Sequence, residues 1–206
     1  MKALLINGSP GAKGCTYIAL TELKNTLEKE GIETELIHMG HKDIRGCIAC
    51  RKFAQTGKCV FDDVVNEVAP KLAEADAFII GAPVYYASPA GGAIAFLDRL
   101  FFSTMNIDKT MKVGAAVVTC RRGGNTSSFD VLNKYFSINS MPIASSQYWN
   151  MVYCGQAEEV LLDKEGLQTM RTLGRNIAFM VKSIALGKEK YGLPEKEQTI
   201  FTNFHH

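Results

Sequence analysis

Residues 4–16 read Leu-Leu-Ile-Asn-Gly-Ser-Pro-Gly-Ala-Lys-Gly-Cys-Thr, and this stretch decides the fold. The apolar run at 3–6 is typical of a buried parallel strand, and the loop after it consists of small and hydroxyl residues. A helix is predicted to begin around Cys15, because the apolar residues that follow recur near helical spacing. Free backbone N–H groups and the positive end of the helix dipole then meet at this loop, which favours binding of a phosphate group.

The residues of the loop exclude two common kinds of phosphate-binding site. No Gly-Lys-Ser/Thr follows Gly8 at the spacing of a nucleotide P-loop, and the loop contains no Gly-x-Gly-x-x-Gly. What remains is a cradle for a phosphate monoester, in which Ser9 and Thr16 supply hydroxyl donors. Gly11 and Gly14 let the backbone come close to the ligand. Taken alone, the loop is equally well explained as an ordinary strand-to-helix turn.

The composition is that of a folded α/β protein. The chain has 206 residues, of which 47% are hydrophobic and 21% charged, and this fits one domain with a sizeable core. The formal charge of +2 and the scattered basic residues argue against nucleic acid as a partner. No apolar run is long enough to span a bilayer, so we expect no membrane insertion and a cytoplasmic location. In that compartment the six cysteines are expected to be mostly thiols.

Strands and helices are predicted to alternate along the chain. The predicted strands cover residues 2–7, 34–38, 77–80, 113–118 and, more weakly, 142–145. The predicted helices cover residues 15–31, 62–75, 89–102, 127–136 and 166–186. Repeated strand–helix units imply a parallel sheet covered on both faces, here a domain over 1–187 followed by a tail over 188–206. Five such strands favour a flavodoxin-like three-layer sandwich with strand order 2-1-3-4-5.

Three loops converge at one edge of the predicted sheet, beyond the carboxyl ends of strands one, three and four. They are the phosphate loop, the segment 82–89 and the segment 119–124. A planar polycyclic ligand needs flat apolar walls, which are offered by Pro83, Val84, Tyr85 and Tyr86. It also needs backbone donors, which Gly123 and Gly124 can supply. Taken singly, the tyrosines are explained by packing and Arg121-Arg122 by a solvated loop, but their coincidence at one edge favours a ligand site.

Five segments of the chain match the motifs of one known family. They are Asn-Gly-Ser-Pro at 7–10 with Gly14 and Thr16, Ala-Pro-Val-Tyr-Tyr at 82–86, Phe-Leu-Asp-Arg at 96–99, Arg-Arg-Gly-Gly at 121–124 and Ser-Gln-Tyr-Trp-Asn at 146–150. With these motifs the chain resembles the NAD(P)H-dependent FMN reductase family of flavodoxin-like proteins. Within that family it is similar to the iron–sulfur flavoprotein branch, whose members carry a compact cysteine motif after the second strand. The resemblance covers almost the whole chain up to Leu186.

The resemblance implies a bound FMN, with its phosphate on residues 9–16 and its ring against 83–86 and 119–124. The FMN-binding residues that it implies are Ser9, Gly11, Lys13, Gly14, Cys15, Thr16, Pro83, Val84, Tyr85, Tyr86, Ser88, Thr119, Arg121, Arg122, Gly123 and Gly124. The family often has a basic residue in place of Gly11 and asparagine in place of Cys15. Here Lys13 can supply the charge instead.

The resemblance also implies an activity. NAD(P)H would be the co-substrate and hydride donor, and the acceptor would be a small molecule such as a quinone or a free flavin. The flavin N5 carries the chemistry, so no side chain is expected to be catalytic. A homodimer or homotetramer is expected. The alternative is an electron-transfer flavoprotein that passes electrons between protein partners.

Cys47, Cys50 and Cys59 have a spacing that suggests metal ligands. In the iron–sulfur branch the motif is Cys-x2-Cys-x2-Cys, with a fourth cysteine a few residues later. Phe53 stands at the third position here. Three thiolates therefore remain where a cubane cluster needs four ligands.

Several interpretations of this cysteine motif stay open. His38 or His41 can complete a mixed zinc site, since both lie nearby in the sequence. A transient disulfide, a degenerate cluster site and reduced structural thiols are the others. The metal-free interpretation is favoured, because cysteine is readily buried as a small hydrophobe. No metal site is therefore predicted.

Overall fold

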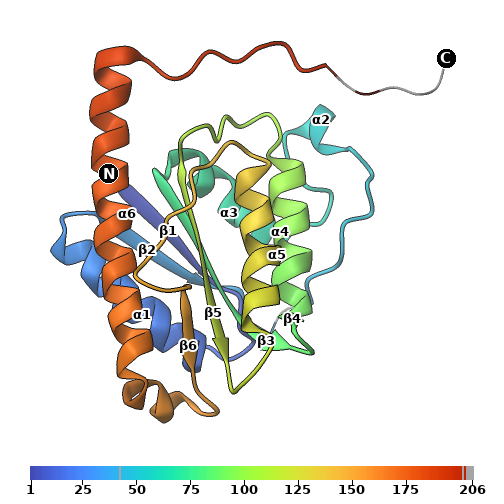
Figure 1. Ribbon diagram of the computed structural model, residues 1–206. Helices are drawn as coiled ribbons and strands as arrows, with labels where there is room; N and C mark the ends of the chain where they lie inside the picture. Colours follow the sequence, from blue (N-terminus) through green and yellow to red (C-terminus); the bar gives the residue numbers. More distant parts are fainter. Residues whose placement is uncertain (42, 201, 203–206) are drawn as a thin grey trace.

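The computed structural model describes residues 1–41, 43–200 and 202. Five parallel strands form one sheet in the order β2-β1-β3-β5-β6 (Figure 1). They are β1 (Lys2–Asn7), β2 (Glu33–His38), β3 (Ala77–Tyr85), β5 (Val113–Cys120) and β6 (Met151–Tyr153). The two-residue strand β4 (Ser88–Pro89) pairs antiparallel with the end of β3. The predicted flavodoxin-like order is thus confirmed, with one short hairpin strand added.

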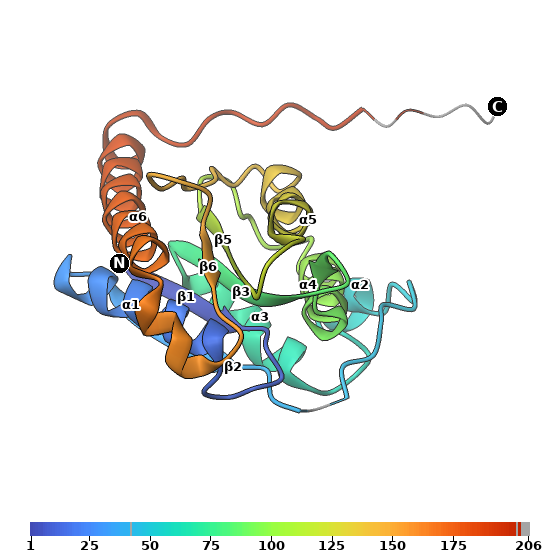
Figure 2. The ribbon, with the colours of Figure 1, turned by 60° about the horizontal axis from the view of Figure 1, so that its bottom comes forward.

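Helices cover both faces of the sheet, as Figures 1 and 2 show. On one face lie α1 (Cys15–Lys29) and α6 (Lys164–Tyr191), and on the other α3 (Val64–Glu74), α4 (Gly91–Ser103) and α5 (Asn125–Ser137). Two shorter helices are α2 (Phe53–Thr56) and the 3-10 helix η1 (Ala157–Leu162). The residues of β1 alternate between two cores: Ala3 and Leu5 belong to the core on the α1 side, and Leu4 and Ile6 to the other. This alternation follows from the two-residue period of the strand.

The last parallel strand lies elsewhere than predicted. Residues 142–145 contribute a single bridge, between Gly114 and Ile143, and the paired strand β6 comes later. From that bridge to the start of β6, strand β5 advances only from Gly114 to Val118, while the outer segment advances from Ile143 to Met151. The surplus residues loop out of the sheet. The strand is therefore interrupted, which the weak local pattern did not reveal.

Strand β3 continues beyond residue 80, where it was predicted to end, and runs through Pro83 to Tyr85. Strand β1 ends at Asn7, which lies opposite Gly81, so β3 has lost one neighbour by the time it reaches Pro83. At that edge the missing N–H of a proline leaves no ladder bond unmade. The Pro83 carbonyl accepts the Ala90 N–H at 3.0 Å, which closes the hairpin and delays the start of α4 to Gly91.

Helix α6 is the longest helix and ends at Tyr191 rather than near Leu186. One side of it is buried in the core, and exposed side chains such as Phe179 and Leu186 lie on the rest. Across residues 1–41, 43–200 and 202, no helix combines the length and the apolar character that crossing a membrane requires.

Candidate functional site

The loop after β1 forms an anion cradle at the start of α1. Gly14 precedes the helix without a side-chain cap, and the first turn carries no acidic residue. The N–H groups at this end of the helix therefore remain available to an anion. Ser9 is 9% exposed and Thr16 only 1% exposed. The other predicted residues of the loop are half-buried or exposed: Gly11, Lys13, Gly14 and Cys15.

A hydrogen bond joins the cradle to the end of β5. The Thr16 and Thr119 hydroxyl oxygens lie 2.8 Å apart, and both side chains are buried. If Thr119 donates this bond, the Thr16 hydrogen remains free for a ligand oxygen. Two residues predicted for one site from distant segments are thus brought together.

Asn7 and His38 shape the cradle, although sequence reasoning assigned neither to it and considered His38 only as a zinc ligand beside the cysteines. The fully buried Asn7 accepts the Ser9 N–H at 3.1 Å, and its Nδ2 lies 3.4 Å from the Gly11 carbonyl oxygen. His38 is opposite Asn7 in the register of β1 and β2, and its Nε2 lies 2.9 Å from the Ser9 carbonyl oxygen. A carbonyl only accepts, so this nitrogen carries the hydrogen. The Asn-Gly-Ser-Pro motif included Asn7, but the role of His38 depends on strand register, which no local pattern shows.

The hairpin between β3 and β4 carries the predicted aromatic wall. Tyr86 is fully exposed at its tip and Tyr85 is half-exposed, while Pro83 and Val84 are half-buried and Ser88 is exposed. Tyr86 and Ala87 have φ angles of +51° and +58°. Positive φ at both central positions defines a type I′ turn, which favours Asn-Gly, and other residues there lose roughly 1–2 kcal/mol each. A strained tyrosine without packing partners points to a contact with a ligand.

The loop after β5 is fastened to this hairpin. Gly124 has a φ of +87°, and a Cβ built on it would lie 2.5 Å from the Ala87 Cα. The Ser127 hydroxyl donates to the Ala87 carbonyl at 2.7 Å. Arg121, Arg122 and Gly123 are exposed in the same loop. All three predicted loops are therefore in contact at one edge of the sheet, through the Thr16–Thr119 hydrogen bond and the packing of Gly124 against Ala87.

Replacing Gly124 by alanine is expected to lower the free energy of unfolding by about 2 kcal/mol or more, since backbone strain adds to the clash with Ala87. The matched control is Gly123→Ala, because a Cβ there meets no atom within 4 Å. Urea unfolding of the two variants provides the comparison. Equal midpoints for both would show that the loop and the hairpin are not in close contact.

Two cavities lie at opposite edges of the sheet, and their positions decide which of them belongs to the candidate site. One of about 280 Å³ lies beside the cradle, with Gly8 and Pro10 from the phosphate loop and Tyr85 from the hairpin among its walls. A larger one of about 680 Å³ lies at the opposite edge of the sheet, where Asp76 and Lys112 precede their strands. Ligands of open parallel sheets bind beyond the carboxyl ends of the strands, so the smaller cavity belongs to the candidate site.

The buried thiols next to the cradle add no negative charge to it. Burial raises the pKa of the Cys120 thiol, and burial together with the neighbouring Cys15 raises that of Cys154. Both therefore stay neutral at physiological pH. An anion bound at the start of α1 meets no opposing thiolate from these two residues.

The other three cysteines gather around a separate cavity, in what we call the cysteine lobe (residues 44–63). Cys47, Cys50 and Cys59 line a cavity of about 20 Å³ beside α4. The α4 residues at this cavity lie in the second half of the helix, whereas its first half starts next to β4. The cavity between the cysteines is therefore away from the edge that carries the cradle and the hairpin, whereas Ile44, at the start of the lobe, lines the cavity beside the cradle.

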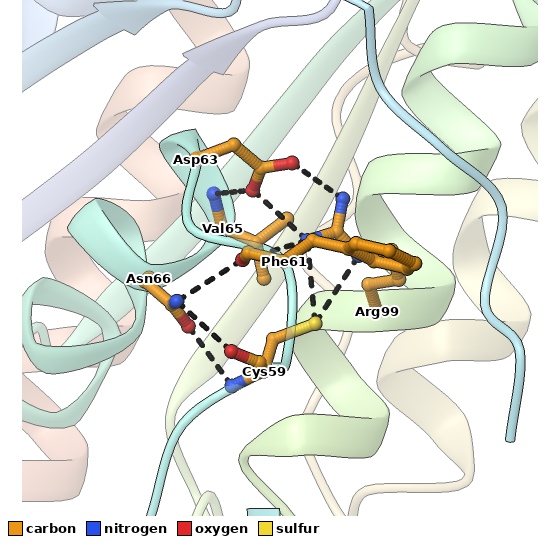
Figure 3. Close-up of polar contacts among 6 residues, drawn as sticks. All are labelled: Cys59, Phe61, Asp63, Val65, Asn66 and Arg99. Carbon is orange, nitrogen blue, oxygen red and sulfur yellow. Dashed lines mark hydrogen bonds and ion pairs between the residues drawn. The ribbon is translucent and has the colours of Figure 1, made fainter. Parts of the chain in front are cut away.

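Arg99 of α4 is the centre of the polar contacts in the cysteine lobe (Figure 3). It is 1% exposed, and its Nη1 and Nη2 donate to the two Asp63 carboxylate oxygens at 2.6 and 3.0 Å. Its Nε and Nη2 lie 3.3 and 3.2 Å from the Cys59 Sγ. The guanidinium also stands 5.0 Å from the centre of the Phe61 ring. The Asn66 side chain accepts the Cys59 N–H at 2.9 Å and donates to the Cys59 carbonyl at 3.1 Å.

The sheet order, the uncapped helix start and the ligand edge define a flavodoxin-like protein. Residues 1–155 match the model of the NADPH-dependent FMN reductase family, and the chain belongs to this family. It is 33% identical to an iron–sulfur flavoprotein of Methanocaldococcus jannaschii, over 89% of this chain and 99% of that one. It is 27% identical to an iron–sulfur flavoprotein of Methanosarcina thermophila, over 92% of this chain and 100% of that one. The family expected from the motifs is confirmed.

Solved structures agree on the fold. A crystal structure of RosB with bound 8-demethyl-8-formylriboflavin-5′-phosphate has a TM-score of 0.69 at 14% identity, covering 100% of this chain and 92% of that one. A flavodoxin from the domain Archaea has a TM-score of 0.60 at 16% identity, covering 88% of this chain and 99% of that one. Family membership makes the chain an FMN-binding flavoprotein with a redox function. The uncapped start of α1 and the exposed hairpin tip fit a phosphate and a planar ring.

Proposed function

We propose that this chain is an FMN-dependent oxidoreductase that takes hydride from NAD(P)H and reduces a quinone, a free flavin or a similar small acceptor. The observation that carries the proposal is the strained, fully exposed Tyr86 on the same sheet edge as an uncapped helix start. When bound, FMN supplies the ring that accepts and releases hydride. Family membership supports this class of activity, and the identity of donor and acceptor is our proposal.

The cradle is proposed to hold the FMN phosphate. The N–H groups at the start of α1 donate to the phosphate oxygens, together with the hydroxyls of Ser9 and Thr16. Lys13 is exposed at the rim and adds positive charge. Gly11, Gly14 and Cys15 complete the loop and place no bulky side chain in it.

The hairpin and the loop after β5 are proposed to hold the ring. Pro83, Val84, Tyr85 and Tyr86 offer an apolar wall, with Ser88 at its end. Thr119, Gly123 and Gly124 place hydroxyl and backbone groups at the ring edge. Arg121 and Arg122 bring positive charge, which stabilises the negative charge that builds up in the site as electrons enter.

A steady-state assay tests the proposed function. The FMN-loaded protein is mixed with NADPH or NADH and a soluble quinone, and oxidation of the nicotinamide is followed. We expect turnover that depends on both substrates and shows ping-pong kinetics. No turnover with quinones or free flavin, combined with reduction by a redox protein, would favour the alternative of electron transfer between protein partners.

A homodimer or homotetramer is proposed, with the flavin edge near the subunit boundary. Tyr148 and Trp149, in the segment that loops out before β6, are 54% and 51% exposed, and their ring centres lie 5.0 Å apart. Aromatic residues are enriched in interfaces, where they bury a large area at a small cost in entropy. Phe101, by contrast, is 6% exposed and packs in the protein's own core.

Light scattering of the FMN-loaded protein at micromolar concentration measures this oligomeric state. We expect a mass of two or four chains. A mass near 22.6 kDa, that of one chain, would contradict the proposal.

A further inference from the structure

The residues of the cysteine lobe do not fit the iron–sulfur cluster that the names of the chain's relatives suggest. We propose that the cysteine lobe holds no iron–sulfur cluster in this protein, and that Arg99 and Phe53 fasten it to α4 instead. The inference concerns the cysteine lobe alone and does not rest on the proposed donor or acceptor at the flavin edge. Three observations carry it: the donor set, the space, and the protein contacts of Cys59.

The donor set is one ligand short. The cavity in the cysteine lobe is lined by three cysteines, and Phe53 holds the third position of the four-cysteine pattern. A cubane cluster takes four cysteine thiolates. Among the described residues, no group of three or more histidine, cysteine, aspartate or glutamate side chains is arranged to hold a metal ion.

Little space remains in the cavity that the three cysteines line together with Phe53. The Phe53 ring packs edge-on against Phe102 of α4, with ring centres 5.0 Å apart. The cavity that remains, about 20 Å³, has room for about one water molecule. A cluster of four irons and four sulfides is far larger than this cavity, so the cavity as packed does not hold one.

Cys59 is already held by the protein. Arg99 is buried and aims two N–H groups at the Cys59 sulfur, while its other contacts go to Asp63 and the Phe61 carbonyl. Both backbone polar groups of Cys59 are paired with Asn66. The strand of chain around Cys59 is thus anchored to α3 and α4 without a metal. Cys47 and Cys50 are exposed.

Iron and sulfide analysis after anaerobic purification and reconstitution tests the absence of a cluster. We expect no stoichiometric iron in the natural protein, and about four irons per chain in Phe53→Cys, which completes the ligand set. Phe53→Ala opens the space without adding a thiol and is expected to stay iron-free. Iron at about four per chain in the natural protein would overturn the proposal. Iron in Phe53→Ala, or none in Phe53→Cys, would overturn the role of Phe53.

Limited trypsin digestion of the full chain tests the fastening, since Arg51, Lys52 and Lys58 are exposed in the cysteine lobe. Arg99→Lys keeps the charge next to Asp63 but lacks the planar fork of five N–H donors that reaches the carboxylate, the Phe61 carbonyl and the sulfur at once. We expect severalfold faster cleavage in the cysteine lobe of this variant, and no change when an iron chelator is added to the natural protein. Acceleration by the chelator, or equal cleavage of both proteins without it, would overturn the proposal.

Discussion

Replacing Arg99 by methionine is expected to lower the free energy of unfolding by about 3–5 kcal/mol, the range for breaking a buried ion pair by removal of one partner. The Arg99 side chain is 1% exposed and that of Asp63 only 19% exposed. Without the guanidinium, the Asp63 carboxylate keeps only its bond from the Val65 N–H at the start of α3. The Cys59 sulfur loses both of its bonds from the guanidinium, and the Phe61 carbonyl loses one donor and keeps the Asn66 side chain.

Arg171→Met is the matched control for this prediction. Arg171 pairs with Glu22 at 2.6 Å, but their side chains are 40% and 30% exposed. Exposed ion pairs contribute about 1 kcal/mol or less, so the control is expected to remain close to the natural protein. Urea unfolding with FMN absent measures both. Similar losses in the two variants would mean that the cysteine lobe is not anchored through Arg99.

Replacing Thr16 by alanine is expected to weaken FMN binding about tenfold or more. A hydrogen bond to a charged group contributes about 1.5–3 kcal/mol, and 1.4 kcal/mol corresponds to a factor of ten in affinity. The Thr16 side chain is 1% exposed and already fixed by its bond to Thr119, so little order has to be gained on binding. Titration of flavin fluorescence gives the dissociation constants.

Thr16→Ser separates the hydroxyl from the rest of the side chain. It keeps the oxygen and removes only the methyl group, so its affinity for FMN is expected to stay within about twofold of the natural protein. An unchanged dissociation constant in Thr16→Ala would place the phosphate elsewhere. Equal losses in both variants would indicate that packing of the methyl group, rather than the hydroxyl, matters.

The core of the fold was predictable because it is encoded locally. The apolar runs that form β1, β3 and β5 are buried on both faces, so their positions follow from composition alone. The last strand was misplaced because its pairing with β5 is interrupted by a loop, and pairing across the sheet leaves no trace in residues 142–145. The continuation of β3 through Pro83 likewise depends on where β1 ends.

Some features of the candidate site were likewise predictable from consecutive residues, and others depend on residues far apart in the chain. The cradle was recognisable, since a strand, a small-residue loop and a helix start are consecutive in the sequence. The hydrogen bond from His38 to the Ser9 carbonyl was not recognisable, because it depends on the register of two strands that are far apart in the chain. The hydrogen bond between Arg99 and Cys59 joins residues 40 positions apart, so the motifs in their two segments did not predict it. The positive φ of Tyr86 was also unpredictable, as a tyrosine rarely occupies that turn position.

Anaerobic titration of the FMN-loaded protein with NADPH, and with NADH in parallel, tests the proposed hydride transfer most directly when the visible absorption of oxidised flavin is followed. We predict that about one equivalent of one of these nucleotides bleaches the flavin, since a hydride carries both electrons. Adding a quinone should then restore the oxidised spectrum. Flavin that is bound but stays oxidised with an excess of both nucleotides would contradict the proposed function.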